Sequence, residues 1–160
     1  MAIDGIEIID SDSAYDIYND ITERYKDGED VEKIKQKWIK EEENFCIDEL
    51  YTEIYWTAFA YSLWKIGFLD ETIKQKTMSI LSKGASEIWN KIDPKAQKQR
   101  QKVLDKLAIQ LQSENKKPIK KPKLKKQKEP FFQVGDVLAI EMPQGYGLVL
   151  YLLWTKLPGK

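Results

Sequence analysis

The stretch IYWTAFAYSLWKIGFLDETI, from Ile54 to Ile73, decides the fold. Its first thirteen residues are mostly aromatic, aliphatic or small, so a helix formed here has almost no polar side and must be surrounded by other helices. Gly67 can end that helix in a left-handed conformation, and Asp70 can cap the next one. The sequence therefore predicts a central buried helix from about Asp48 to Ile66, followed directly by a second helix.

Amphipathic patterns predict two further helices before the central one. The first is expected from Ser13 to Lys26, with Asp12 or Ser13 as its N-cap and Gly28 as its left-handed C-terminal residue. The second is expected from the capping residue Asp30 to about Glu43, because apolar residues recur there at intervals of three and four.

Two further helices are expected after the central one. The helix capped by Asp70 should end at Gly84, and a short segment around Ile88 and Trp89 follows it. The pair Asp93-Pro94 is typical of a helix start, with Asp as N-cap and Pro at the first helical position. The long helix that begins there should run to about Gln112.

The remaining residues predict a linker and a β-hairpin. Residues 113–130, SENKKPIKKPKLKKQKEP, contain eight Lys and three Pro, which favours an extended linker. The strand-forming runs FFQVGDVLAIEM and YGLVLYLLW follow, separated by Pro143-Gln144-Gly145, which is typical of a turn. The predicted fold class is mainly α: a five- or six-helix domain, residues 1–112, then the linker 113–130 and a short β-hairpin or partial β-barrel, residues 131–160.

A hairpin of this size cannot bury enough apolar surface to be stable alone. It must pack on the helices, pair with another chain, or begin a larger β-module. A homo-oligomer formed through the C-terminal strands and a chain truncated from a longer protein are both consistent with the pattern.

The composition argues against several classes of function. The chain has no His, the commonest general base and transition-metal ligand, and its one cysteine, Cys46, is expected to be a small buried hydrophobe. We therefore expect no enzyme activity, no metal site and no cofactor. The opening MAIDGIEIID has neither a basic nor an apolar leader region, and no apolar run approaches the about 20 residues that span a membrane. The expected location is the cytoplasm, without membrane association.

Acidic residues are concentrated at the start of the chain. The first 50 residues carry 16 Asp/Glu against six Lys/Arg, a net charge of −10. A solvated helical surface is the common explanation for such acids, and their spacing does not match a calcium-binding loop. The sharper hypothesis is that they bind a basic protein, because complementary charges speed and orient association. The candidate partner-binding residues are Asp10, Asp12, Asp16, Asp20, Glu41, Glu42 and Glu43.

Lysines and aromatic residues supply two further candidates. The linker lysines are a solvated tether, a nonspecific polyanion site, or a segment that folds back on the acidic helices. They are Lys116, Lys117, Lys120, Lys121, Lys123, Lys125, Lys126 and Lys128. An aromatic band on the central helix belongs either to the core or to a ligand pocket. Its members are Tyr51, Tyr55, Trp56, Phe59, Tyr61 and Trp64.

Three stretches resemble known proteins. The runs SDSAYDIYNDITERYKDGEDVEKI and IYWTAFAYSLWKIGFLDETIKQKTMSIL, with the Lys/Pro tract and FQVGDVLAIEM that follow, resemble a family of uncharacterised bacterial proteins with a helical N-terminal domain. The shared features are an SD-A-D-like opening and a W-x-x-G-x-L-D corner, here Ser11, Asp12, Ala14, Asp16, Trp64, Gly67, Leu69 and Asp70. The run FQVGDVLAIEM is similar to the first strand of small β-barrel modules in immunity proteins of bacterial toxin systems, through residues 134–137.

These resemblances imply no known enzyme activity. Together with the charge pattern, they favour a noncatalytic protein-protein interaction protein of the immunity or antitoxin type, whose acidic helical face binds a basic partner such as a nuclease. The alternative is a nucleic-acid-associated accessory protein that binds through the lysine-rich linker.

Overall fold

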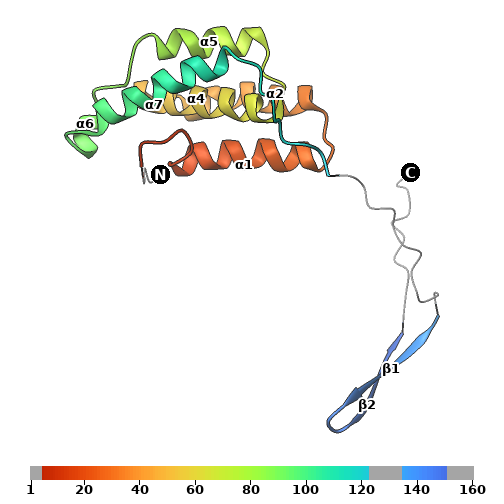
Figure 1. Ribbon diagram of the computed structural model, residues 1–160. Helices are drawn as coiled ribbons and strands as arrows, with labels where there is room; N and C mark the ends of the chain where they lie inside the picture. Colours follow the sequence, from red (N-terminus) through yellow and green to blue (C-terminus); the bar gives the residue numbers. More distant parts are fainter. Residues whose placement is uncertain (1–4, 123–134, 151–160) are drawn as a thin grey trace. The chain divides into compact units, whose positions relative to one another are not determined.

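The computed structural model describes residues 5–122 and 135–150, and the chain divides into two units, Met1–Pro122 and Lys123–Lys160 (Figure 1). The first unit contains α1 (Asp12–Lys26), α2 (Val31–Lys40), α3 (Glu42–Phe45), α4 (Glu49–Ile66), α5 (Glu71–Leu81), α6 (Trp89–Ile92) and α7 (Ala96–Leu111). The second contains β1 (Val137–Met142) and β2 (Gly145–Leu150). Five helices have ten or more residues, and α3 and α6 have four each. The predicted mainly helical fold with a short C-terminal hairpin is confirmed.

Helix α4 is the centre of the helical unit, and α1, α5 and α7 all pack against it (Figure 1). Twelve of its 18 residues are buried, as its nearly uniform apolar composition predicts. The rings of Tyr55, Trp56 and Phe59 contact one another within this core. Burying each such side chain contributes roughly 1.5–3 kcal/mol to folding. Three members of the aromatic band are therefore core residues.

The helix starts follow local capping chemistry. Asp30 and Asp70 cap α2 and α5 as predicted: their carboxylates accept the N–H of Glu32 and of Ile73, both at 2.9 Å. The N-cap of α1 is different from the expectation. Ser11 Oγ accepts the N–H of Ala14 at 3.2 Å, so the helix begins at Asp12 rather than at Ser13.

Two predicted helix boundaries are corrected by tertiary contacts and turns. The second predicted helix stops at Lys40, and the short α3 follows it, because Phe45 turns inward to contact the rings of Trp38 and Tyr55. At Asp93-Pro94 the chain forms a turn, in which the Asp93 carbonyl accepts the N–H of Ala96 at 2.9 Å. Helix α7 therefore begins at Ala96, after the predicted start.

Residues 113–122, which we call the strap, follow α7 and lie against the end of α4. Asn115 donates to the carbonyls of Trp64 and Lys65, and the N–H of Ile119 donates to the Lys65 carbonyl at 2.8 Å. Gly67 has a φ of +80°, and a side chain there would meet Pro118 at 3.1 Å. These ten residues, expected in the linker, are extended but belong to the helical unit.

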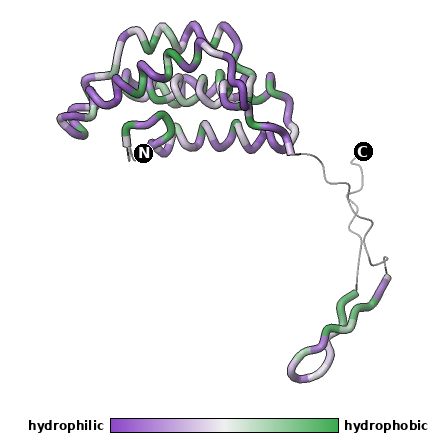
Figure 2. The backbone as a smooth tube through the Cα atoms, in the orientation of Figure 1, coloured by the Kyte–Doolittle hydropathy of each residue, from purple (hydrophilic) through white to green (hydrophobic). Residues whose placement is uncertain are grey.

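The second unit is an antiparallel hairpin in the described residues. Val137 pairs with Leu150 and Met142 pairs with Gly145, so Pro143 and Gln144 form a two-residue turn at the predicted place. Both strands are rich in hydrophobic residues (Figure 2), and Tyr146 and Leu148 are among their exposed side chains. The remainder of the predicted strands lies outside the described residues.

None of the helices in the described ranges combines the length and the apolar composition that crossing a bilayer requires.

Candidate functional site

The seven acidic residues predicted to bind a basic partner fall into two groups. Three have exposed side chains: Asp12, Asp16 and Glu43. Four are partly buried and accept hydrogen bonds within the helical unit: Asp10, Asp20, Glu41 and Glu42. For example, Asp10 accepts the N–H of Glu7 at 3.0 Å. The structure therefore does not present all seven as one binding surface.

Asp20 joins α1 to α2. Its carboxylate accepts from Arg24 at 2.9 Å, from Lys37 at 2.8 Å and from the indole N–H of Trp38 at 2.9 Å. Burial disfavours the charged form, but the hydrogen bonds from these three side chains outweigh it, so the pKa of Asp20 is lowered. Asp20 therefore stabilises the fold, and its carboxylate is already hydrogen-bonded within the helical unit.

Glu42 makes a similar link between α3, α4 and α5. Its carboxylate accepts from Lys76 at 2.6 and 2.8 Å and from the indole N–H of Trp56 at 3.2 Å. The Lys76 ammonium also lies 4.2 Å from the centre of the Trp56 ring, within the range of a cation–π contact. Glu42 is therefore a structural residue.

The outer side of α1 carries two of the three exposed candidates, Asp12 and Asp16, whereas Glu43 lies on α3. Residues three and four apart on a helix share a face, and such positions on α1 are exposed from its first to its third turn. We call this set the α1 stripe: Asp12, Tyr15, Asp16, Asn19 and Glu23. Tyr15 is 56% exposed and lies between the two aspartates in sequence. The stripe combines an aromatic side chain with carboxylates and contains no basic residue.

The helical unit also contains a buried ion pair, which was not predicted from the sequence. Arg100 on α7 donates to Glu53 on α4 at 2.8 Å, and their side chains are 1% and 3% exposed. Arg100 also donates to the carbonyls of Ile6 and Glu7, both at 2.8 Å. Glu53 accepts the N–H of Ser86 at 3.0 Å. Because every group has partners, the pair joins four segments of the fold.

Two features of the sequence indicate this ion pair only weakly. Glu53 interrupts the apolar surface of α4, and Arg100 is the only arginine of α7. Neither reveals the other, because 47 residues separate them. The pair is enclosed by packing and hydrogen-bonded throughout, which is typical of a structural role rather than of a reactive one.

Half of the predicted polyanion-binding lysines lie in the strap. Lys116, Lys117, Lys120 and Lys121 have exposed side chains, and the Lys121 ammonium lies 5.1 Å from the ring centre of Tyr25. The other half lies outside the described residues: Lys123, Lys125, Lys126 and Lys128.

A second group of lysines on α7 was not predicted. The N-cap Lys95 and the helical Lys98, Lys102 and Lys106 are all exposed and recur at intervals of three and four residues, so they lie toward one side of α7. The buried residues Val103, Leu104 and Leu107 occupy the opposite side. The same spacing of three and four residues is present in the sequence.

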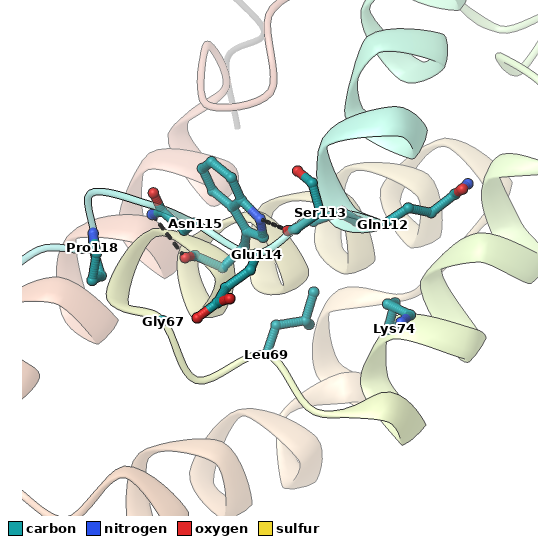
Figure 3. A pocket seen from close by; sticks show the side chains of 10 residues that line it. Gly67, Leu69, Lys74, Gln112, Ser113, Glu114, Asn115 and Pro118 are labelled. Atoms are coloured by element: carbon teal, nitrogen blue, oxygen red, sulfur yellow. Dashed lines mark hydrogen bonds between the residues drawn. The ribbon is translucent and has the colours of Figure 1, made fainter.

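One described depression has two charged residues in its lining, Lys74 and Glu114. It has a volume of about 300 Å³ and lies between the end of α4, the start of α5 and the strap (Figure 3). Leu69 forms part of its wall, while Glu114 and Lys74 bring charge to it, and the Trp64 indole is already engaged with the Ser113 carbonyl at 2.7 Å. Of the aromatic band, only Trp64 lines this depression.

In the described ranges 5–122 and 135–150, no group of three or more acidic or cysteine side chains is placed to hold a metal ion. Cys46 is half-buried beside the core, and burial raises the pKa of its thiol, which keeps it protonated near neutral pH.

Comparison with protein-family models, with curated proteins and with solved structures finds no match to this chain. The family resemblance therefore stays a prediction.

Proposed function

We propose that this chain is a noncatalytic protein-protein interaction protein of the immunity or antitoxin type, which binds a basic partner protein in the cytoplasm through the α1 stripe. The observation that supports the proposal is the exposed Tyr15 flanked by Asp12 and Asp16. Tyrosine is enriched among the few residues that carry most of the binding energy in protein interfaces, and charged neighbours add electrostatic complementarity to a partner of opposite charge.

The charge of the surrounding segment favours a cationic partner. Residues 1–82 carry 19 Asp/Glu against nine Lys/Arg, a net charge of −10. Such a field accelerates the encounter with a basic protein and orients it, and Tyr15 can then be desolvated in a pocket of that partner. A nuclease has the required chemistry, because its substrate site must attract phosphates. Occluding that site is the activity that the resemblance to immunity proteins implies.

The paired acids limit the proposed site to the α1 stripe. Binding a partner through Asp20 or Glu42 requires breaking contacts with Lys37 or Lys76 that stabilise the helical unit. Within the α1 stripe, Asp16 forms no ion pair with another described residue, whereas Glu23 pairs with Lys26 at 2.7 Å. The α1 stripe therefore keeps two of the seven predicted acids, Asp12 and Asp16, and adds Tyr15, Asn19 and Glu23.

The test uses the tagged full chain as bait in the nuclease-treated cytoplasm of its native host. Wild type is compared with the variant Tyr15→Ala/Asp16→Lys. The control Ile109→Ala/Asp105→Lys truncates an apolar side chain that is 72% exposed and reverses one exposed charge on α7. We expect one stoichiometric basic protein with wild type and with the control, bound at least about 10-fold more weakly by the α1 variant.

Equal recovery with both variants would show that the α1 stripe is not the binding surface. Recovery of no stoichiometric protein with wild type would contradict the proposed function itself.

A further inference from the structure

We infer that the outer side of α7 is a second binding surface, which takes the phosphate backbone of double-stranded nucleic acid. The surface is defined by Lys95, Lys98, Lys102 and Lys106, which we call the α7 lysine face. The inference is independent of the proposed function, because it concerns other residues and a partner of opposite charge.

The four ammonium groups have no anionic partner in the part of the chain that the structure describes. All four side chains are exposed, and none is within ion-pair distance of a described carboxylate. The nearest acids in sequence are Asp93 and Asp105: Asp93 accepts the backbone N–H of Lys95 at 2.7 Å, and Asp105 accepts a hydrogen bond from Gln101 at 2.8 Å. Three positive charges on one side of α7, and a fourth at its N-cap Lys95, therefore face solvent without an ion pair to a described carboxylate.

Uncompensated lysines are not the general pattern of this molecule. Among the described residues up to 82, six of nine Lys/Arg form ion pairs. Residues 83–122 have 11 Lys/Arg against four Asp/Glu, a net charge of +7, and only the buried Arg100 forms an ion pair there. Positive charge is thus concentrated in one segment instead of being balanced locally.

The dimensions of the face suit a polyanion of high charge density. Eleven residues separate Lys95 from Lys106, which corresponds to about 16 Å along a helix. Duplex DNA carries one charge per about 1.7 Å of its axis, so several phosphates can lie along this length. A depression of about 410 Å³ between Lys98 and Lys102, also lined by Gln97 and Gln101, adds neutral donors beside the charges.

The residue types on the α7 lysine face favour one kind of anionic partner over the others. Single strands are bound largely by stacking bases on aromatic side chains, and the α7 lysine face has none. Membrane-surface helices insert an apolar side into the lipid, whereas the apolar side of α7 is buried in the core through Leu104 and Leu107. Bidentate arginine, the common reader of guanine, is also absent from the face. Sequence-independent contact with a duplex fits best.

The test measures binding of the full chain to a fluorescein-labelled 20-base-pair DNA duplex by anisotropy, between 0.05 and 0.3 M NaCl. The variant Lys98→Gln/Lys102→Gln removes two charges from the face. The control Lys33→Gln/Lys40→Gln removes two exposed, unpaired lysines from α2. Because each lost phosphate contact reduces the salt slope by about 0.9, the face variant should flatten the slope by about 1.8 and weaken binding about 60-fold at 0.1 M salt.

The control should bind as wild type does, and thermal melting should show that both variants remain folded. Equal weakening by the two variants, or no duplex binding by wild type, would overturn the inference. Tighter binding to a single strand of equal length, or binding only to phosphatidylserine vesicles, would overturn it as well. If Lys123→Gln/Lys125→Gln/Lys126→Gln/Lys128→Gln abolishes duplex binding while the face variant does not, the linker is the site instead.

Discussion

Residues 1–82 and residues 83–122 of the helical unit use charge in opposite ways. In the first region carboxylates such as Asp20, Glu42 and Asp70 each hold a cation from a neighbouring helix, so charge connects the elements. In the second region the only ion pair of the described residues is Glu53–Arg100, which reaches back to α4 and is buried. None of its exposed lysines forms an ion pair with a described residue, and Lys121 contacts the ring of Tyr25 on α1. Charge therefore stabilises the first region and remains available for binding in the second.

The largest expected effect comes from breaking the one ion pair of the second region. Arg100→Met should destabilise the protein by about 3–5 kcal/mol, because it leaves the Glu53 carboxylate buried without its cation. Urea unfolding followed by circular dichroism measures the loss. The double variant Glu53→Leu/Arg100→Met should recover most of it. Equal instability of the single and double variants would show that packing, not the unpaired charge, dominates.

The second prediction concerns the contact between the two regions. Gly67→Ala should destabilise the protein by about 1–2 kcal/mol, because alanine is strained at positive φ and its methyl group meets Pro118. Gly28→Ala is the matched control, with a φ of +90° and no neighbour within 4 Å of an added side-chain carbon. If the strap is packed as described, the Gly67 variant should lose more stability than the control. Equal losses would mean that the strap contributes nothing to the difference.

The third prediction tests charge as a connector in the first region. Asp20→Asn should cost about 1 kcal/mol at neutral pH, since the site is partly exposed and solvent screens it. The lowered pKa fixes the sign of the pH dependence. The stabilising contribution of the Asp20 carboxylate is fully present above pH 3.8, the ordinary pKa of aspartate. It is lost as the pH falls through the lower pKa of the folded state. The free energies of unfolding of wild type and variant should therefore converge in strong acid. An unchanged difference there would contradict the hydrogen bonds assigned to Asp20.

The sequence reveals those features that depend on neighbours along the chain. Asp30 and Asp70 act as caps because each accepts N–H groups within the three residues that follow it. Helix α4 is buried because nearly every side of it is apolar. Long-range pairing was not predictable. The acids Asp20 and Glu42 read as free surface charges, and only the packing of helices 17 and 34 residues away shows their partners. The break after α2 was missed for the same reason, since Phe45 turns toward Trp38 and Tyr55.

The smallest expected effect sharpens the comparison most. Replacing Lys98, Lys102 and Lys106 together by glutamine should change the free energy of unfolding by less than about 0.5 kcal/mol, because exposed side chains without partners contribute little to folding. Lys37→Gln alone should cost more, since Lys37 holds Asp20 at 2.8 Å. Urea unfolding of the two variants measures both. If the triple variant loses less stability than Lys37→Gln, the lysines of α7 have no structural role. A large loss of stability in the triple variant would mean that they stabilise the fold.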